Sequence, residues 1–412
     1  MTGVETAAER GGPEPGAANR SVEMDSARGW LVVAATFTST FTVFGVAYSF
    51  APFFGPMADE FGGERSEVAL FFAITTFFYF SLGVISGRVS DRVGPRKVLL
   101  FGGAAMVLGL LATSQVQSLW VGYLTYGLGV GIGVACAYVP MVATVGLWFE
   151  RRRSAAMGVA VAGIGVGTLV AAPTAEALID RYGWRDTYVI LAVATAVLIG
   201  LASLGAGRPP VTVDEAPVPP LRDLIGRSRA FGVLYLSCLV LVIPLFVPFV
   251  FIGDYLDAEG IDGSAGLVVA VIGSSSVVGR LGLGALAARV SAIRLYQGSF
   301  LGVGCSFALW LVADTTYWLL VVFAAVFGVA YGGFIALAPA VAADLFGPIG
   351  LGGVLGLLYT AAGFGGLAGP PLVGALVDRS GYDATLITVG VLGVVAFLLL
   401  VPLRPDTVQD RP

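Results

Sequence analysis

Residues Val271–Val290 read VIGSSSVVGRLGLGALAARV, an apolar stretch long enough to cross a bilayer, with one charge in its interior, Arg280. The pattern predicts a helix over about 264–289, in which Arg280 lies roughly 13.5 Å before Arg289. That depth is near the middle of a hydrocarbon core of about 30 Å. A charge there costs roughly 2.5–3.5 kcal/mol on insertion scales unless it meets a partner or water. The function of the chain therefore depends on what pairs with Arg280.

The composition is that of a polytopic membrane protein. Of the 412 residues, 57% are hydrophobic and 12% are charged, and the mean hydropathy is +0.89. Soluble domains average about 25% charged residues. Glycine, at 58 residues, is unusually frequent, which favours close packing of membrane helices. The chain has no histidine, and its three cysteines lie in apolar runs. We therefore expect no enzyme, no metal site, no cofactor and no nucleic-acid partner.

Twelve apolar spans predict an all-α membrane protein with two pseudo-symmetric six-helix halves. The spans are expected at 29–54, 67–87, 98–116, 118–148, 154–179, 186–206, 230–253, 264–289, 294–313, 316–344, 350–377 and 384–403. The expected domains are a disordered cytoplasmic tail, an N-terminal half, a proline-rich cytoplasmic linker, a C-terminal half and a second cytoplasmic tail: 1–27, 28–206, 207–229, 230–404 and 405–412.

The distribution of basic residues predicts the orientation. With both termini in the cytoplasm, 18 of the 23 basic residues fall in inner segments and four in outer loops, and Arg280 is the remaining one. Cytoplasmic segments carry the excess of Lys and Arg in membrane proteins. We therefore expect a multi-pass protein in the lipid bilayer of the plasma membrane, with both termini cytoplasmic, and we expect it to be a monomer.

The two halves repeat each other in sequence. LIDRYG at 178–183 matches LVDRSG at 376–381, an offset of 198 residues. At the same offset, Gly165 and Pro173 match Gly363 and Pro371. The repeat indicates duplicated halves, the plan of transporters that bind their substrate between the halves at mid-membrane.

A basic motif, GRVSDRVGPRK, occupies residues 87–97 between the second and third spans. It resembles the inner loop of the major facilitator superfamily, which implies the fold of that superfamily. We predict a conformational clamp on the inner side, formed with a second basic cluster: Gly87, Asp91, Arg92, Gly94, Arg96, Arg151 and Arg152. Since Ala288 replaces the aspartate in the second copy, the clamp would be one-sided. The alternative is a basic loop that only sets the topology.

The stretch WFERRRSAAMGVAVAG at 148–163 is similar to the signature that opens the fifth helix of monocarboxylate transporters, and YGWR at 182–185 is also similar to that family. In this family the arginine of the eighth helix binds the substrate carboxylate, so the resemblance implies that role for Arg280. A second signature, acidic-Gly-Gly-Trp-Gly-Trp before the first helix, is reduced here to Gly29-Trp30.

Two departures concern proton coupling and the charge of the substrate. Animal members of the family carry an aspartate where this chain has Ser276, and a lysine in the first helix, where 29–54 has none. Oxalate–formate antiporters also resemble the chain and use a second cation in the eleventh helix, but 350–377 contains no Lys or Arg. A dianion would therefore meet a single charge.

Arg280 has two interpretations. It binds a mobile anion, or it is a structural tether near a helix end. The first is favoured because no Asp or Glu lies at similar depth in another span and because its counterpart in the repeat is Gly83. The other candidate lining residues, each of which has packing as its alternative role, are Tyr331, Ser276, Phe364 and Tyr126.

These features predict a secondary transporter of a small monocarboxylate such as lactate or pyruvate, working by alternating access with proton coupling. The alternatives are an organic anion exchanger of the oxalate–formate type and a membrane sensor that binds an anion without moving it. Uptake into vesicles separates the sensor from the transporters.

The predicted topology is testable by cysteine labelling. A cysteine at Ser380 should react with an impermeant reagent from outside intact cells, whereas a cysteine at Ser228 should react only after the membrane is opened. The reverse pattern would contradict the orientation.

Overall fold

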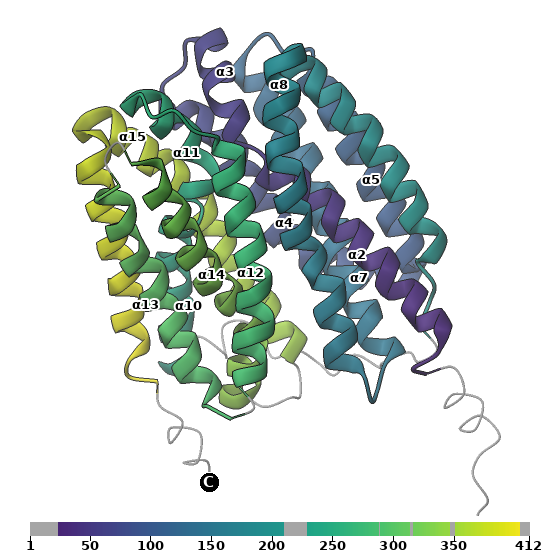
Figure 1. The fold of residues 1–412 in the computed structure, drawn as a ribbon. Helices are drawn as coiled ribbons and strands as arrows, with labels where there is room; N and C mark the ends of the chain where they lie inside the picture. The colour runs from purple at the N-terminus through teal and green to yellow at the C-terminus, as the bar shows by residue number, and fades with distance from the viewer. Residues whose placement is uncertain (1–23, 210–228, 288, 314–315, 347–350, 404–412) are drawn as a thin grey trace, which may run out of the picture.

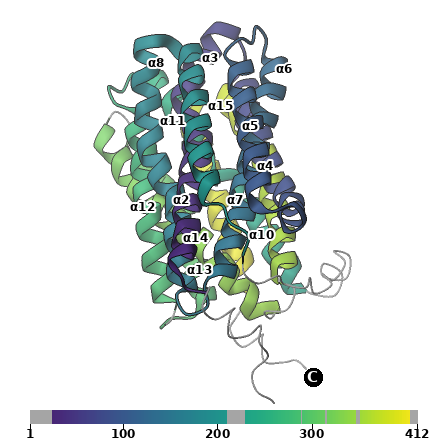
Figure 2. The same cartoon turned by 90° about the vertical axis from the view of Figure 1, so that its right-hand side faces the viewer.

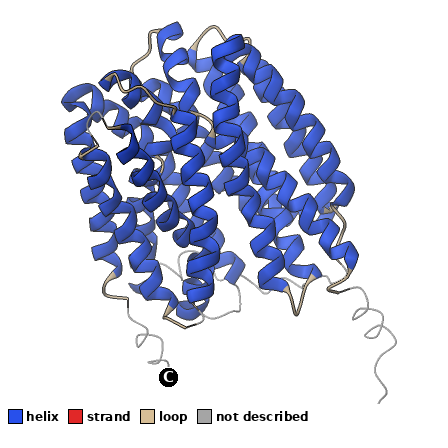
Figure 3. Ribbon diagram, in the orientation of Figure 1, coloured by secondary structure: helices blue, strands red, loops and turns tan. Residues whose placement is uncertain are grey.

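The computed structural model describes residues 24–209, 229–287, 289–313, 316–346 and 351–403. Most of the predicted N-terminal tail, most of the predicted linker, Ala288 and the C-terminal tail lie outside these residues. Every secondary-structure element of the described chain is a helix (Figure 3), which confirms the predicted all-α fold class.

The helices form two halves that lie side by side (Figure 1). The first half comprises α2 (Ala27–Tyr48), α3 (Ala51–Phe61), α4 (Arg65–Val93), α5 (Pro95–Thr113), α6 (Leu119–Gly122), the π-helix η1 (Tyr123–Leu128), α7 (Gly129–Trp148) and α8 (Arg153–Gly205). The second half comprises α10 (Arg229–Leu245), α11 (Val247–Glu259), α12 (Ala265–Leu286), α13 (Ala292–Leu311), α14 (Tyr317–Phe346) and α15 (Leu351–Leu400).

The long helices run lengthwise between the same two ends of the bundle (Figures 1 and 2). We call the end at which α2 begins and α15 finishes the terminal end, and the opposite end the distal end. Nine helices of the described chain are long and apolar enough to span a bilayer. Two of these run over 155–205 and 353–400 and would each extend about 70–80 Å if straight, more than twice the hydrocarbon core.

Each of these two long helices therefore folds back at a glycine. Gly183 has φ 79° and ψ 164°, and Gly381 has φ 75° and ψ 177°. Such positive φ angles favour glycine because it lacks a Cβ atom. Counting two spans in each of the two helices and adding the 20-residue α13 gives the twelve predicted spans.

Some predicted boundaries were wrong. The first span was expected to end at 54, but α2 ends at Tyr48, and α3 starts at Ala51 with a proline in its first turn. The basic motif at 87–97 was expected to be a loop, but α4 continues to Val93 and α5 begins at Pro95. Proline fits the first turn of a helix because its missing N–H would have no partner there. The turn is thus reduced to Gly94, with φ 94°.

One contact between the halves brings the backbones of α8 and α12 together. A Cβ atom on Gly273 of α12 would lie 2.7 Å from the carbonyl oxygen of Gly165 of α8, and one on Gly165 would lie 2.6 Å from that of Gly273. Apolar lipid gives membrane helices no hydrophobic drive to associate, so they pack through such small residues. This contact fixes α12 against the other half of the molecule.

The second contact between the halves joins α15 to α4. A Cβ atom on Gly374 would lie 2.7 Å from the backbone nitrogen of Ser66, and one on Gly366 would lie 2.2 Å from the Thr76 side chain. Gly374 therefore packs on the first turn of α4, at the distal end. The same helix start carries its own capping box, in which the Glu64 backbone N–H donates to Glu67 at 3.1 Å.

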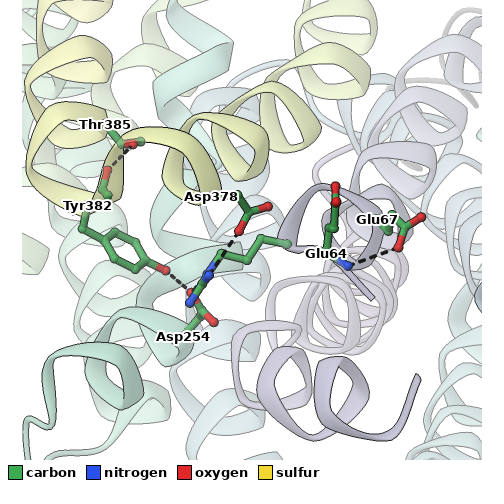
Figure 4. A network of polar contacts seen from close by, with 8 residues as sticks. Glu64, Glu67, Asp254, Asp378, Tyr382 and Thr385 are labelled. Atoms are coloured by element: carbon green, nitrogen blue, oxygen red, sulfur yellow. Dashed lines mark hydrogen bonds and ion pairs between the residues drawn. The ribbon is translucent and has the colours of Figure 1, made fainter. Parts of the chain in front are cut away.

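Ion pairs reinforce the distal end. Arg65, at the start of α4, donates to Asp254 of α11 at 2.5 Å and to Asp378 of α15 at 3.1 Å. The Tyr382 hydroxyl also donates to Asp254. Figure 4 shows Asp254, Asp378 and Tyr382 converging there. Because Asp254 is only 13% exposed, salt screens this pair less than an open surface pair.

A second polar contact at the distal end also crosses between the halves. The Glu176 carboxylate of α8 accepts hydrogen bonds from the backbone N–H groups of Ala265 and Gly266, each at 3.0 Å, and from the Ser264 hydroxyl. These groups form the N-terminus of α12, where the helix dipole favours negative charge. In this conformation the distal end is therefore closed by contacts on two sides.

The close approach of α8 and α12 predicts that replacing glycines of α12 by alanine changes stability differently at different positions. Gly273→Ala should lower the free energy of unfolding by about 1–3 kcal/mol, because the new methyl group overlaps backbone atoms of α8. Gly284→Ala on the same helix has nothing within 4 Å and should stabilise the helix by up to about 1 kcal/mol. Thermal unfolding of both variants in detergent measures the difference, and equal stability would contradict the packing described.

Candidate functional site

Arg280 lies on α12 with its side chain facing the other half. The residue is 8% exposed, and its Nη1 donates to the backbone oxygen of Val161 on α8 at 3.0 Å. The guanidinium carbon lies 5.9 Å from the centre of the Tyr331 ring. Since α12 ends at Leu286, Arg280 is about 9 Å from the helix end and not the 13.5 Å expected from the longer helix.

Two of the three guanidinium nitrogens have no hydrogen-bond partner. Nε and Nη2 of Arg280 are buried and make no hydrogen bond to any described residue. These atoms carry three of the five N–H donors of the group. Buried polar groups are almost always hydrogen-bonded, so an exception requires a physical explanation. The free Nε and Nη2 edge is the edge with which arginine binds a carboxylate in bidentate fashion.

A cavity lies between the two halves, and although Arg280 does not line it, Tyr331, whose ring is next to the guanidinium, does. Its walls are mainly aromatic, and its volume in this conformation is about 40 Å³, which is enough for one or two water molecules. The residues that line it are Phe44, Tyr48, Tyr79, Phe80, Tyr138, Ile164, Leu245, Phe246, Tyr331, Phe334, Ile335, Ala338, Tyr359 and Ala362. The lining, apolar with a few polar tips, is of the kind found in small-molecule sites, while the volume in this conformation is well below the roughly 300–1,000 Å³ of such pockets.

Tyrosine hydroxyls join the halves across this cavity. Tyr331 of α14 donates to the hydroxyl of Tyr48 of α2 at 3.0 Å, and Tyr48 lies 3.5 Å from the hydroxyl of Tyr79 of α4. Tyr48 and Tyr331 are each 3% exposed. The chain of hydroxyls begins at Tyr331, whose ring centre lies 5.9 Å from the guanidinium carbon of Arg280, and continues into the first half through Tyr48 and Tyr79.

The structure brings together two of the five predicted substrate residues, Arg280 and Tyr331. Ser276 is buried, but its hydroxyl donates to Gly273 of its own helix at 2.7 Å. Phe364 is 51% exposed and packs on Phe77, on the outside of the bundle. Tyr126 lies in η1 and packs on Phe50, away from the cavity. The geometry therefore does not support a lining role for Ser276, Phe364 or Tyr126.

Sequence reasoning missed most of the cavity wall. Tyr48, Tyr79, Tyr138 and Tyr359 all line it, and each interrupts an apolar span with a polar atom. That interruption is the one signal that could have identified them. It also marks Tyr126, which faces a different part of the core, so the signal does not separate lining residues from packed ones.

The residues of the predicted clamp lie at the terminal end. Gly87, Asp91 and Arg92 are in the last turns of α4, and Gly94 forms the turn before Arg96 in the first turn of α5. Arg151 and Arg152 stand between α7 and α8. The five charged members are exposed. The clamp stays a prediction.

Asp25 organises the segment that contains Arg151 and Arg152. Its carboxylate accepts hydrogen bonds from the backbone N–H groups of Glu150, Arg151 and Arg152 at 3.1–3.3 Å. Desolvation alone would raise the pKa of the Asp25 carboxyl, but these hydrogen bonds and the Arg152 charge bring the pKa below its ordinary value. Asp25 stands five residues before Trp30, where the signature before the first helix has its acid. The chain therefore keeps the acidic position of that signature as Asp25, in addition to the expected Gly29-Trp30.

The chain is similar to known membrane transporters over most of its length. The model of the Major Facilitator Superfamily matches residues 36–316 and 283–412. Monocarboxylate transporter 11 of Mus musculus is 31% identical over 377 residues, which cover 87% of this chain and 83% of that protein. Monocarboxylate transporter 13 of Rattus norvegicus is 31% identical over 391 residues, 92% of this chain and 89% of that protein. Monocarboxylate transporter 3 of the same organism is 30% identical over 385 residues, covering 89% and 77%.

Proposed function

The chain belongs to the Major Facilitator Superfamily, and within it to the monocarboxylate transporter family, and on that premise we propose that it carries a small monocarboxylate across the plasma membrane. It is a multi-pass membrane transporter and not an enzyme. We propose that it works as a monomer with both termini, and hence the terminal end, in the cytoplasm.

The observation that carries the proposal is the unpaired edge of Arg280. A carboxylate that approaches Nε and Nη2 would make two parallel charge-assisted hydrogen bonds and neutralise the buried cation. Tyr331 and Tyr48 would offer hydroxyls to a polar group beside the carboxylate, and the aromatic rings would surround the apolar remainder. Lactate and pyruvate have this combination of one charge, one neighbouring oxygen and a methyl group.

The position of Arg280 supports movement by alternating access. The one hydrogen bond of its side chain to the described protein runs from α12 in the second half to Val161 in the first half. A substrate bound at Arg280 thus sits where the halves meet, so separating them at one end exposes it to that side. With neither histidine in the chain nor a carboxylate paired with Arg280 among the described residues, we propose that a proton accompanies the substrate.

Exchange of organic anions is the alternative mode, and a non-transporting sensor is the alternative function. Both share the anion site at Arg280. Purified protein in vesicles separates them: net uptake driven by a pH gradient supports symport, uptake that requires an internal anion indicates exchange, and binding without uptake indicates a sensor.

Replacing Arg280 tests the site itself. Arg280→Gln should lower uptake per folded molecule about 10- to 100-fold, since a charged hydrogen bond contributes about 1.5–3 kcal/mol and each 1.4 kcal/mol is a factor of ten. Its melting temperature without substrate should be equal to or above that of the parent, because an unpaired buried cation has been removed. Arg280→Lys should restore little uptake, because an ammonium lacks the planar fork.

Arg379→Gln, which alters an exposed arginine at the distal end, is the matched control and should behave like the parent. A less stable Arg280→Gln protein whose folded fraction transports normally would show that Arg280 is a tether and would refute its role in substrate binding.

The single cation also predicts selectivity for monoanions. A diacid would leave its second carboxylate desolvated and unpaired, which costs several kcal/mol. Lactate and pyruvate should therefore compete with labelled substrate more strongly than oxalate and malonate. Stronger inhibition by the diacids would contradict the monocarboxylate assignment and favour the exchanger.

A further inference from the structure

A second cavity lies at the terminal end, where α4 ends, α5 begins and α8 ends. Its volume is about 310 Å³, within the roughly 300–1,000 Å³ of small-molecule sites. Since Arg96, Lys97 and Arg208 are exposed, the cavity is open to the surface. The residues that line it are Val93, Gly94, Pro95, Arg96, Lys97, Ala206 and Arg208.

The charge of this cavity is entirely positive. Three of its seven lining residues are cations and none is an acid. Arg96, Lys97 and Arg208 form no ion pair with any residue of the described chain. The first turn of α5 has no side-chain cap, and its helix dipole adds to the positive potential. A hollow lined by charges of one sign concentrates ions of the opposite sign, so the cavity attracts an anion.

The guanidinium of Arg208 reaches the cavity by lying over Gly94. A Cβ atom on Gly94 would lie 2.9 Å from Nε and 3.5 Å from Nη2 of Arg208. Gly94 thus leaves room for a side chain that comes from beyond the end of α8. The planar fork of a guanidinium matches the oxygens of a phosphate, and the ammonium of Lys97 adds a point charge. The three cations together suit a phosphate group.

The sequence repeat shows that the fold does not require this basic cavity. At the offset of 197 residues that relates the ends of α4 and α12, Gly94 corresponds to Ser291 and Arg96 to Ile293. Ser291 has φ −52°, and Ile293 is buried. The second half therefore makes its turn without a glycine and with an apolar side chain in place of one cation. Basic residues also set the topology of membrane proteins, but that role needs no shared hollow.

Exposed apolar side chains border the cavity. The helices α5 and α8 lie side by side there, since a Cβ atom on Gly103 would lie 2.5 Å from Cγ2 of Ile199. Within the two turns nearest the cavity they expose Phe101, Leu201 and Leu204. Basic pockets between membrane helices on the cytoplasmic side bind the headgroups of anionic lipids. A lipid with its phosphate in the cavity would lay its acyl chains on these side chains, whereas a soluble phosphate would leave them uncovered.

We propose that this cavity binds a phosphate group, and that the phosphate belongs to an anionic phospholipid whose acyl chains lie along α5 and α8. The site is separate from Arg280 and goes beyond the proposed function. It requires only that the terminal end lies at the membrane surface, so failure of the monocarboxylate assignment would leave it standing.

Native mass spectrometry of the detergent-solubilised chain tests the proposal, because it resolves each bound lipid. The probes are dioleoyl phosphatidic acid, whose phosphate is terminal, and dioleoyl phosphatidylcholine, whose phosphate carries a cationic choline. The first equivalent of phosphatidic acid should bind at least about tenfold more tightly than phosphatidylcholine, since choline repels the three cations. Inorganic phosphate at the same concentration should not displace it. Such displacement would overturn the phospholipid as the source of the phosphate.

Replacing the cations locates the bound lipid. Arg208→Gln should weaken binding of phosphatidic acid about fivefold, and combining it with Arg96→Gln and Lys97→Gln should weaken it about 100-fold, if each cation contributes as a basic residue near an anionic surface does. Circular dichroism during heating checks that each variant is folded. Because Arg208 lies beyond the last residue of α8, its single replacement keeps the test decisive if the triple variant does not fold.

The matched control removes three exposed arginines from the terminal end of the second half, outside the cavity. These are Arg229→Gln, Arg289→Gln and Arg294→Gln, combined in one protein. It should bind phosphatidic acid like the parent. A control that loses as much affinity as the cavity variant, or a folded cavity variant that binds like the parent, would overturn the proposal.

Discussion

A guanidinium buried between two halves, with no counter-charge among the described residues, is the constraint on which the rest of the structure depends. A cation in a low-dielectric region must find dipoles, water or an anion, and Arg280 finds one carbonyl and the face of one aromatic ring. The remaining donors, on Nε and Nη2, make no hydrogen bond to the described residues and are the ones we propose for the substrate carboxylate. Everything that positions α12 therefore also positions the site.

α12 is held against the first half at three levels. Its N-terminus receives the Glu176 carboxylate, its middle meets α8 backbone to backbone at Gly165 and Gly273, and Arg280 reaches Val161 nearer the terminal end. The three contacts differ in kind. The first joins a carboxylate to a helix dipole, the second is a close approach of two backbones, and the third is a hydrogen bond from a guanidinium to a carbonyl oxygen. A rocking motion between the halves would thus act on three different kinds of contact along one helix.

The sequence predicted the parts of this arrangement that follow from hydropathy and charge. Arg280 was identifiable because one charge in a long apolar run is costly, and the repeat at 198 residues identified the paired halves. Tyr48 and Tyr79 were not identifiable as cavity residues. A membrane span is apolar on every side, so its sequence does not show which face meets lipid, which packs in the core and which lines a cavity. Phe364 illustrates the same difficulty, since its mid-span position fits a cavity wall or an outer surface equally well, and its side chain is 51% exposed and does not line the cavity. The predicted helix ends were wrong for another reason. The backbone continues to Val93 in α4 because polar residues such as Arg92 remain helical beyond the membrane.

The hydrogen-bond partner of Arg280 Nη1 has a consequence for how the amino-acid sequence can vary. The oxygen that binds Arg280 belongs to the main chain at Val161 and not to a side chain. Every residue at position 161 supplies the same carbonyl, so this junction between the halves is insensitive to the amino acid encoded there. Related sequences can therefore drift at position 161 while keeping the contact, and a comparison based on side-chain identity would overlook one of the fixed points of the molecule. Only a change in the path of α8 itself would move that oxygen away from Arg280.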